Sequence, residues 1–145
     1  MVSKLLKGAL AAAMLSVAPV AAIAQDTAAE VAALGGDAKA GKKVYRKCKA
    51  CHVIDKDKNR VGPHQVGIIG RPAAAIEGFK YSDAMIAKGE EGLVWNVETL
   101  SAYLANPKGY IEGTKMAFAG LKKEDDIANV ITYMAEEGGI FEATN

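Results

Sequence analysis

The chain has 145 residues and carries 18 Lys and Arg against 17 Asp and Glu, a formal net charge of +1. This balance excludes a nucleic-acid-binding protein, because that function needs a strongly basic surface. The length allows one small domain beside a targeting segment.

Residues 1–24 have the three parts of a cleavable signal peptide. Lys4 and Lys7 give a positive start, residues 8–17 an apolar run, and residues 22–24 a small-x-small cleavage signature. The apolar run is short and alanine-rich for a membrane span, so removal after Ala24 is favoured over retention as an anchor. Removing 24 of the 145 residues leaves 121, with 16 basic against 17 acidic side chains.

Residues 25–35 form an alanine-rich extension with weak helical periodicity, and no function is assigned to it. The domain itself is expected over residues 36–145. Asp37 suits the N-cap of a helix that runs to about Lys49. Gly41 inside this helix costs about 1 kcal/mol relative to Ala. It is either a merely tolerated glycine or a place where another backbone approaches closely.

The motif Cys48-Lys49-Ala50-Cys51-His52 contains both cysteines and one of the two histidines of the chain. Cys-x-x-Cys-His is typical of c-type haem attachment, because each thiol can add to one porphyrin vinyl group while the imidazole binds the iron. Three alternatives are weaker. A thioredoxin-like pair would need a βαβ context. A zinc site would have only His64 as its fourth ligand. A structural disulfide would leave the adjoining histidine a coincidence.

Residues 53–75 show little periodicity and contain the breakers Gly62-Pro63, Gly67, Gly70 and Arg71-Pro72. A long irregular segment in a small domain is usually functional or wrapped around something, and a haem offers a large apolar plate. Ser82 is then expected to cap a short helix, residues 83–88, that ends at Gly89.

Two later segments have helical periodicity. Asn96, directly after the only tryptophan, suits the N-cap of a helix to Ala105, which Asn106-Pro107 ends. A last helix begins at Asp125 or Asp126 and closes at Gly138-Gly139. Its apolar stripe is Ile127, Val130, Ile131 and Met134. No strand or repeat is evident, so the chain is expected to be all-α.

A haem iron bound by His52 would have a sixth position to fill, for which the candidates are His64, Met85, Met116 and Met134. Met85 and Met134 lie in predicted helices, where packing is the expected role. His64 is close to His52 in sequence and is expected on the same side of the ring. Met116 lies in a loop between helices, which gives it a modest lead.

From Gly36 to about Met134 the chain resembles the class I c-type cytochromes, of the mitochondrial and bacterial c2 type. The resemblance rests on residues 36–45 (GDAKAGKKVY), the Cys48–His52 motif, Gly62-Pro63, Gly67, Gly70-Arg71, residues 78–84 (GFKYSDA), Trp95 and residues 103–120 (YLANPKGYIEGTKMAFAG). It implies a small all-α fold in which the N- and C-terminal helices cross, with short helices and loops wrapped around one covalently bound haem.

The resemblance also implies the site. Cys48 and Cys51 would form thioethers to haem c, and His52 and Met116 would be the metal ligands. The Pro63 carbonyl would accept the N–H of His52. Tyr103 would donate towards the Met116 sulfur. The other implied cofactor-binding residues are Arg71, Tyr81, Ser82 and Trp95 at the propionates and Phe118 at the haem edge. Gly41 and Tyr45 would meet Val130 and Tyr133 where the terminal helices cross.

Some positions depart from the family pattern. His64-Gln65 stands where Asn-Leu is usual, Met85 where Asn is frequent, and Glu112 where Pro is common. Glu90-Glu91-Gly92 resembles a small insertion. None of these positions is an implied ligand.

The implied function is that of a soluble, monomeric, periplasmic carrier of single electrons, cycling the haem between Fe(II) and Fe(III). With both axial positions filled, the protein would be no enzyme and would bind no small-molecule substrate. Electrons would pass from a quinol–cytochrome c oxidoreductase to a terminal oxidase or a photosynthetic reaction centre. The alternatives are an open haem that reacts with peroxide or a small gas, and a haem-free thiol protein.

Basic residues are unevenly placed along the chain, and two interpretations of them stay open. They could steer acidic partner surfaces to the haem edge, or they could be a solvated helix face. The first group is Lys39, Lys42, Lys43, Arg46, Lys47 and Lys49, and the later segments add Lys108, Lys115, Lys122 and Lys123.

Overall fold

The computed structural model describes residues 20–142, and the side chains from residue 26 onward. Its regular elements are α1 (Val20–Ala33), α2 (Ala38–Val44), the 3-10 helix η1 (Tyr45–Lys47), α3 (Asp83–Glu90), α4 (Val97–Ala105), α5 (Pro107–Tyr110) and α6 (Glu124–Gly138). Two isolated β-bridges, Ile69 with Ile140 and Pro72 with Val94, are the only β pairing in this range. The all-α prediction is therefore confirmed. None of the helices described is long and apolar enough to cross a membrane.

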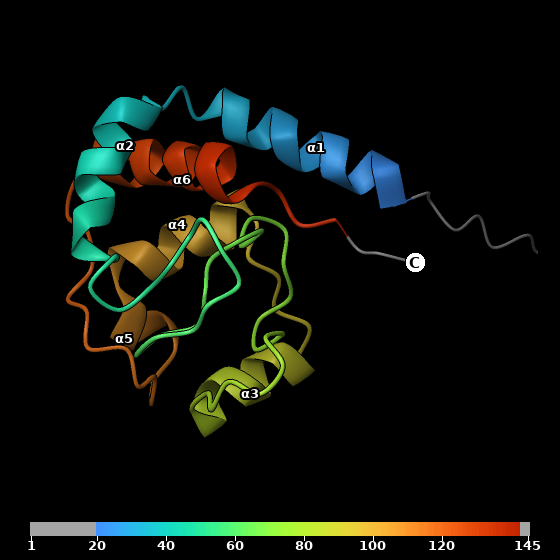
Figure 1. Cartoon of the computed structure of the whole chain (residues 1–145), viewed down its shortest axis with the longest axis vertical. Coiled ribbons are helices and arrows are strands. Elements are labelled where there is room, and N and C mark those ends of the chain that lie inside the picture. The colour runs from blue at the N-terminus through green and yellow to red at the C-terminus, as the bar shows by residue number, and fades with distance from the viewer. Residues whose placement is uncertain (1–19, 143–145) are drawn as a thin grey trace, which may run out of the picture.

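Helices α2 and α6 cross in close contact, and α1 lies beside them (Figure 1). At the crossing, a Cβ on Gly41 would overlap the Asn129 carbonyl and lie 2.7 Å from the Cβ of Tyr133. The rings of Tyr45 and Tyr133 meet one turn along, with their centroids 5.3 Å apart. Gly41 is thus required by a close backbone approach and is not merely tolerated.

The predicted N-caps are all present. The side chain of Asp37 accepts from the Ala40 N–H at 2.7 Å, that of Ser82 from Met85 at 3.1 Å, and that of Asn96 from Thr99 at 2.9 Å. Each bond satisfies a backbone donor that the first helical turn leaves free. The last helix begins at Glu124, one or two residues before the predicted start at Asp125 or Asp126, and Gly139 follows it with φ 77°.

Two helix ends differ from the prediction, and one helix was not predicted. The helix expected to reach Lys49 ends as an α-helix at Val44, because the chain tightens into η1, where the Cys48 N–H donates to the Tyr45 carbonyl at 2.8 Å. Helix α3 continues through Gly89, where a Cβ would lie 2.6 Å from the Ala73 carbonyl, so that glycine allows a close approach and does not end the helix. Helix α5 was not predicted, and it forms because Asn106 accepts from the Gly109 N–H and Pro107 occupies the first helical position.

The extension before Gly36 is better ordered than its weak periodicity indicates. Helix α1 packs against α6 and α4, and it buries Thr27 and Val31. Thr27 lies against Gly70, where a Cβ would meet the threonine side chain at 3.9 Å. The predicted cleavage point after Ala24 falls inside α1, whereas residues 1–19 of the predicted signal peptide lie outside the described residues. Cleavage stays a prediction.

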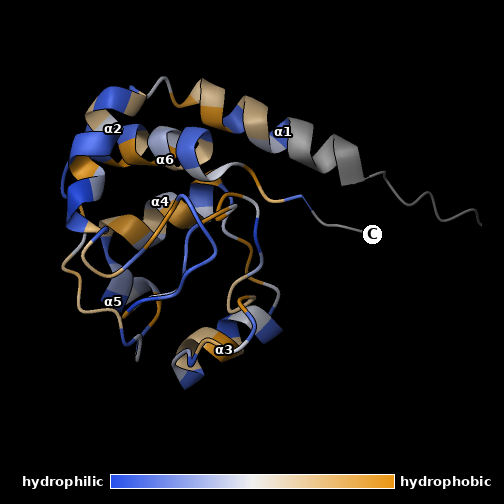
Figure 2. Cartoon of the chain, viewed as in Figure 1, coloured by the Kyte–Doolittle hydropathy of each residue, from blue (hydrophilic) through white to orange (hydrophobic). Residues whose placement is uncertain are grey.

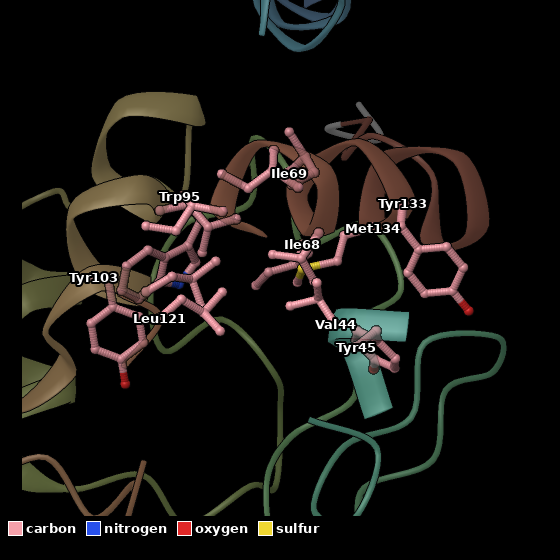
Figure 3. Close-up of a cluster of buried hydrophobic side chains, with 14 of the residues drawn as sticks. Val44, Tyr45, Ile68, Ile69, Trp95, Tyr103, Leu121, Tyr133 and Met134 are labelled. Carbon is pink, nitrogen blue, oxygen red and sulfur yellow. The ribbon is translucent and has the colours of Figure 1, made fainter. Parts of the chain in front are cut away.

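The core is built around α6, whose Val130, Ile131 and Met134 are at most 1% exposed. Helix α2, by contrast, carries three lysines, Lys39, Lys42 and Lys43, which give it the hydrophilic segments in Figure 2. In Figure 3, Tyr45 and Tyr133 lie at one end of the buried cluster, and Trp95, Tyr103 and Leu121 lie at the other. These two ends are the landmarks for the site.

Candidate functional site

The two cysteines and His52 follow η1 in one tight turn. The N–H groups of Cys51 and His52 both donate to the Cys48 carbonyl at 3.0 Å. Both thiols are free and half-buried, so the disulfide alternative is not what the structure contains. Burial raises the pKa of the Cys48 thiol to about 11. The turn therefore presents two free thiols and an imidazole from a five-residue stretch.

His52 is held by the segment that follows it. Its Nδ1 lies 2.7 Å from the Pro63 carbonyl, which can only accept, so Nδ1 carries the proton and Nε2 keeps its lone pair. Burial lowers the pKa of His52, and the bond to Pro63 partly opposes that shift. Gly62 backs the ring so closely that a Cβ would touch Cε1 and lie 2.6 Å from Nδ1. The imidazole is thereby neutral and fixed, as a metal ligand must be.

Sequence reasoning did not find Asn59, whose side chain bonds the peptide group that also holds His52. The amide between Pro63 and His64 is bonded at both ends: its carbonyl accepts from His52, and its N–H donates to Asn59 Oδ1 at 2.9 Å. Donation by the N–H makes the carbonyl a stronger acceptor. Asn59 sits in an irregular loop, and only an asparagine's tendency to bond nearby backbone hinted at this contact.

Met116 has a partner of its own. The Tyr103 hydroxyl donates to its sulfur at 3.8 Å and lies 3.4 Å from Thr114 Oγ1, which also accepts from the Met116 N–H at 3.3 Å. Met116 and Phe118 are both partly buried and pack against the core. Helix α4 positions Tyr103, so the loop from 113 to 116 is tied to a rigid element.

Three of the four residues implied at the propionates make other hydrogen bonds in the structure, and the fourth, Trp95, makes a ring contact. Arg71, 5% exposed, donates to the carbonyls of Val66 at 2.8 Å and His64 at 3.0 Å. Ser82 caps α3, and the Tyr81 hydroxyl accepts from the Ile76 N–H at 3.3 Å. The Trp95 and Tyr103 rings pack with their centroids 4.8 Å apart, and the Trp95 indole N–H donates to no side chain or carbonyl in the part of the chain that the structure describes. The hydroxyl protons and the indole N–H thus remain available as donors.

The other sixth-ligand candidates have different surroundings. Met134, 1% exposed, is core. Met85 packs against the core from α3. The Nδ1 of His64 is buried without a hydrogen-bond partner and lies 3.7 Å from an oxygen of Asp57. Gln65, the polar departure from the family pattern, accepts from the Tyr45 hydroxyl at 2.7 Å, so its polarity is satisfied inside the fold.

The donor set fits a c-type haem better than the alternatives. Two free thiols, an imidazole with a fixed tautomer and a thioether with an oriented sulfur are the groups such a cofactor needs. No three His, Cys, Asp or Glu side chains gather as a metal site between residues 20 and 142, so the zinc alternative has no ligand set in that range.

Comparison with known proteins agrees with this geometry. The family model described as cytochrome c matches residues 38–137. The chain belongs to the cytochrome c family. It is 53% identical over 96 residues to a cytochrome c2 of Afifella marina, which covers 66% of this chain and 77% of that protein. It is 52% identical over 103 residues to a cytochrome c type-1 of Ascaris suum, covering 70% of this chain and 89% of that protein.

Comparison with a solved structure assigns the same family fold. Cytochrome cH from Methylobacterium extorquens superposes with a TM-score of 0.64 at 38% sequence identity, covering 70% of this chain and 99% of that one. The chain is thus a class I c-type cytochrome with the small all-α fold. It carries one haem c bound through Cys48 and Cys51 and acts as an electron carrier, not an enzyme. Helix α1 precedes the family match.

Proposed function

We propose that this cytochrome is a soluble periplasmic carrier of single electrons whose iron is held between His52 and Met116. The observation that carries the proposal is that each donor has a positioning partner, Pro63 at 2.7 Å from His52 and Tyr103 at 3.8 Å from Met116. When bound, the haem supplies reversible one-electron oxidation and reduction.

The chain's own residues then keep the two ligands in place. Pro63 holds the proton on Nδ1 of His52 and leaves Nε2 to bind metal. The backbone of Gly62 lies against the His52 ring and limits its movement. Tyr103 donates to one lone pair of the Met116 sulfur, and the other lone pair would be left to bind the metal. Because both donors are fixed by groups that do not themselves react, little rearrangement accompanies electron transfer.

Export and partners complete the proposal. The signal-like residues 1–24 support a periplasmic location, with cleavage after Ala24. The family supports transfer from a quinol–cytochrome c oxidoreductase to a terminal oxidase or, in a phototroph, a reaction centre. A monomer suits such brief contacts.

Carbon monoxide tests the ligand assignment against an open haem. We expect no change in the visible spectrum of the reduced protein on adding the gas, because an iron bound by both His52 and Met116 would have no position left for it. A shift of the haem bands at neutral pH would contradict the proposal and favour a gas-binding or peroxide-reacting protein.

If lysines near Met116 dock an acidic redox partner, electron transfer should depend on ionic strength. The ammonium of Lys115 donates to the Tyr81 carbonyl at 3.0 Å and that of Lys122 to the Ala119 carbonyl at 3.0 Å, which holds both charges beside the methionine loop. Raising the ionic strength from about 10 mM to about 500 mM should slow electron transfer to a purified acidic partner by about tenfold or more.

Charge-matched variants separate docking from general screening. Lys115→Gln should slow transfer at low salt, whereas Lys88→Gln, on α3 and already paired with Glu91 at 2.6 Å, should have little effect. A rate that is independent of salt, or equal in the two variants, would mean that these lysines are only solvated surface.

A further inference from the structure

Both ends of the described chain extend beyond the part that the cytochrome c family model matches. That match covers residues 38–137, so α1 precedes it, and residues 138–142, here called the tail, follow it. In the view of Figure 1 the tail leaves the end of α6 below α1 and above a green loop. The loop of residues 67–70 contacts both segments, because Gly70 lies near Thr27 of α1 and near Phe141 of the tail.

The tail is joined to this loop through its backbone. The Gly67 N–H donates to the Gly138 carbonyl at 2.7 Å, and the Phe141 N–H donates to the Ile69 carbonyl at 2.8 Å. Ile69, which is 0% exposed, also forms a parallel β-bridge with Ile140. The loop belongs to no helix, so the tail satisfies backbone groups that the loop cannot satisfy by itself.

Side chains of the tail and of α1 also close on the loop. A Cβ on Gly67 would lie 3.6 Å from the Cα of Phe141, and one on Gly70 would lie 3.8 Å from the Cβ of Phe141. The same Cβ on Gly70 would lie 3.9 Å from the side chain of Thr27, which is 7% exposed. Helix α1 and the tail therefore restrict the same two glycines, both of which have positive φ.

The loop leads directly to two residues implied at the propionates. The Gly70 N–H donates to the Trp95 carbonyl at 2.8 Å, and the Trp95 backbone N–H donates to the Arg71 carbonyl at 2.9 Å. The Arg71 guanidinium donates to the carbonyls of His64 and Val66, which come just before the loop. Movement of residues 67–70 would therefore displace Arg71 from its acceptors and would disturb Trp95.

Arg71 is a buried cation without a carboxylate partner in the described part of the chain. It is 5% exposed, and the ion pairs between residues 20 and 142 are His64 with Asp57 and Lys88 with Glu91. A buried charge is costly unless an opposite charge offsets it. The family resemblance implies that the haem propionates supply that opposite charge.

We propose that α1 and the tail form a clasp that positions Arg71 and Trp95 and thereby raises the reduction potential of the haem. A firmly held loop keeps the Arg71 guanidinium away from water, where its charge offsets that of the propionates most strongly. A loosened loop would admit water, which screens this charge and favours the oxidised haem. The inference deepens the electron-carrier function and rests on the implied place of the propionates, not on ligation by Met116.

Phe141→Pro tests the clasp, because it removes the N–H that donates to Ile69. Hydrogen exchange of the intact, haem-loaded, reduced protein, followed by NMR, measures the effect. We expect the backbone amides of Gly67 and Trp95 to exchange about tenfold faster or more. The Leu121 amide, which donates to a carbonyl of α4 at 2.8 Å, should change by less than about twofold.

Two further variants serve as controls for this experiment. Glu142→Pro makes the same change one residue along, at an exposed position whose N–H donates to no group in residues 20–142, and it should leave these exchange rates unchanged. Phe141→Ala keeps the N–H and removes the ring, so it should give a smaller increase, and it replaces Phe141→Pro if that variant does not fold. Unchanged exchange at Gly67 in both Phe141 variants would overturn the clasp. An equal increase at Leu121 would also overturn it, because the protein would then be destabilised as a whole.

The midpoint potential of the haem-loaded variants tests the positioning role. At equilibrium with a reference redox couple, we expect Phe141→Pro to favour the oxidised form by about threefold, equivalent to a potential about 30 mV lower. Thr27→Ala should lower the potential as well, whereas Ala28→Ser, an exposed neighbour on α1, should not. Faster exchange with an unchanged potential would overturn the positioning role. Carbon monoxide binding by the natural protein would instead contradict ligation by Met116 and leave the clasp intact.

Discussion

Gly62→Ala is expected to displace the imidazole of His52. The added Cβ would touch Cε1 and lie 2.6 Å from Nδ1 and 2.8 Å from Nε2, closer than such atoms approach in proteins. The backbone cannot retreat easily, because the Gly62 N–H donates to Cys51 and its carbonyl accepts from Arg60, both at 2.9 Å. The ring must therefore move and weaken its bond to Pro63.

The measurable result is a c-type haem that stays covalently attached but is wrongly ligated. We expect altered visible bands, carbon monoxide binding by the reduced protein and a lower melting temperature. The neighbouring Val61→Ala is a suitable control, because Val61 is 81% exposed and contributes little to the core. An unchanged spectrum and no gas binding in Gly62→Ala would refute this account of the ligand's support.

The two interpretations of Gly41 predict opposite effects of Gly41→Ala on the free energy of unfolding. If Gly41 were merely tolerated, Ala would stabilise the helix by about 1 kcal/mol. The structure places the Asn129 carbonyl where the Cβ would go, so α2 must shift off α6. We expect a net loss of about 2 kcal/mol or more in the free energy of unfolding.

Denaturant unfolding of the oxidised protein measures this difference, with Lys42→Ala as control, since Lys42 is an exposed neighbour on the same helix. A more stable Gly41→Ala protein would mean that the helices do not meet at this residue.

Local signals predicted much of the fold. Asp37, Ser82 and Asn96 bond backbone groups three residues away, so sequence alone contains both partners of each cap. The end of α2 was mispredicted because η1 continues the same apolar side with a tighter turn. Helix α1 was underestimated because its burial depends on a surface that α6 and α4 provide.

The site residues also differ in how far local sequence could predict them. Cys48, Cys51 and His52 are contiguous, and their chemistry could be inferred without a fold. Met116 lies 64 residues beyond His52, so composition gave it only a modest lead over the other candidates and the family resemblance had to add the rest. Gln65 and Asn59 could not be interpreted from sequence, because their partners, Tyr45 and the His64 amide, are joined to them only by folding.

The absorption spectrum of the purified, oxidised protein tests the proposed His52–Met116 assignment most directly. Ferric haem with a methionine ligand has a weak far-red band. We predict this band in the natural protein and its loss in Met116→Ala, with the main haem absorption retained. A haem-loaded natural protein without the band, or a Met116→Ala protein that keeps it, would show that Met116 is not on the iron.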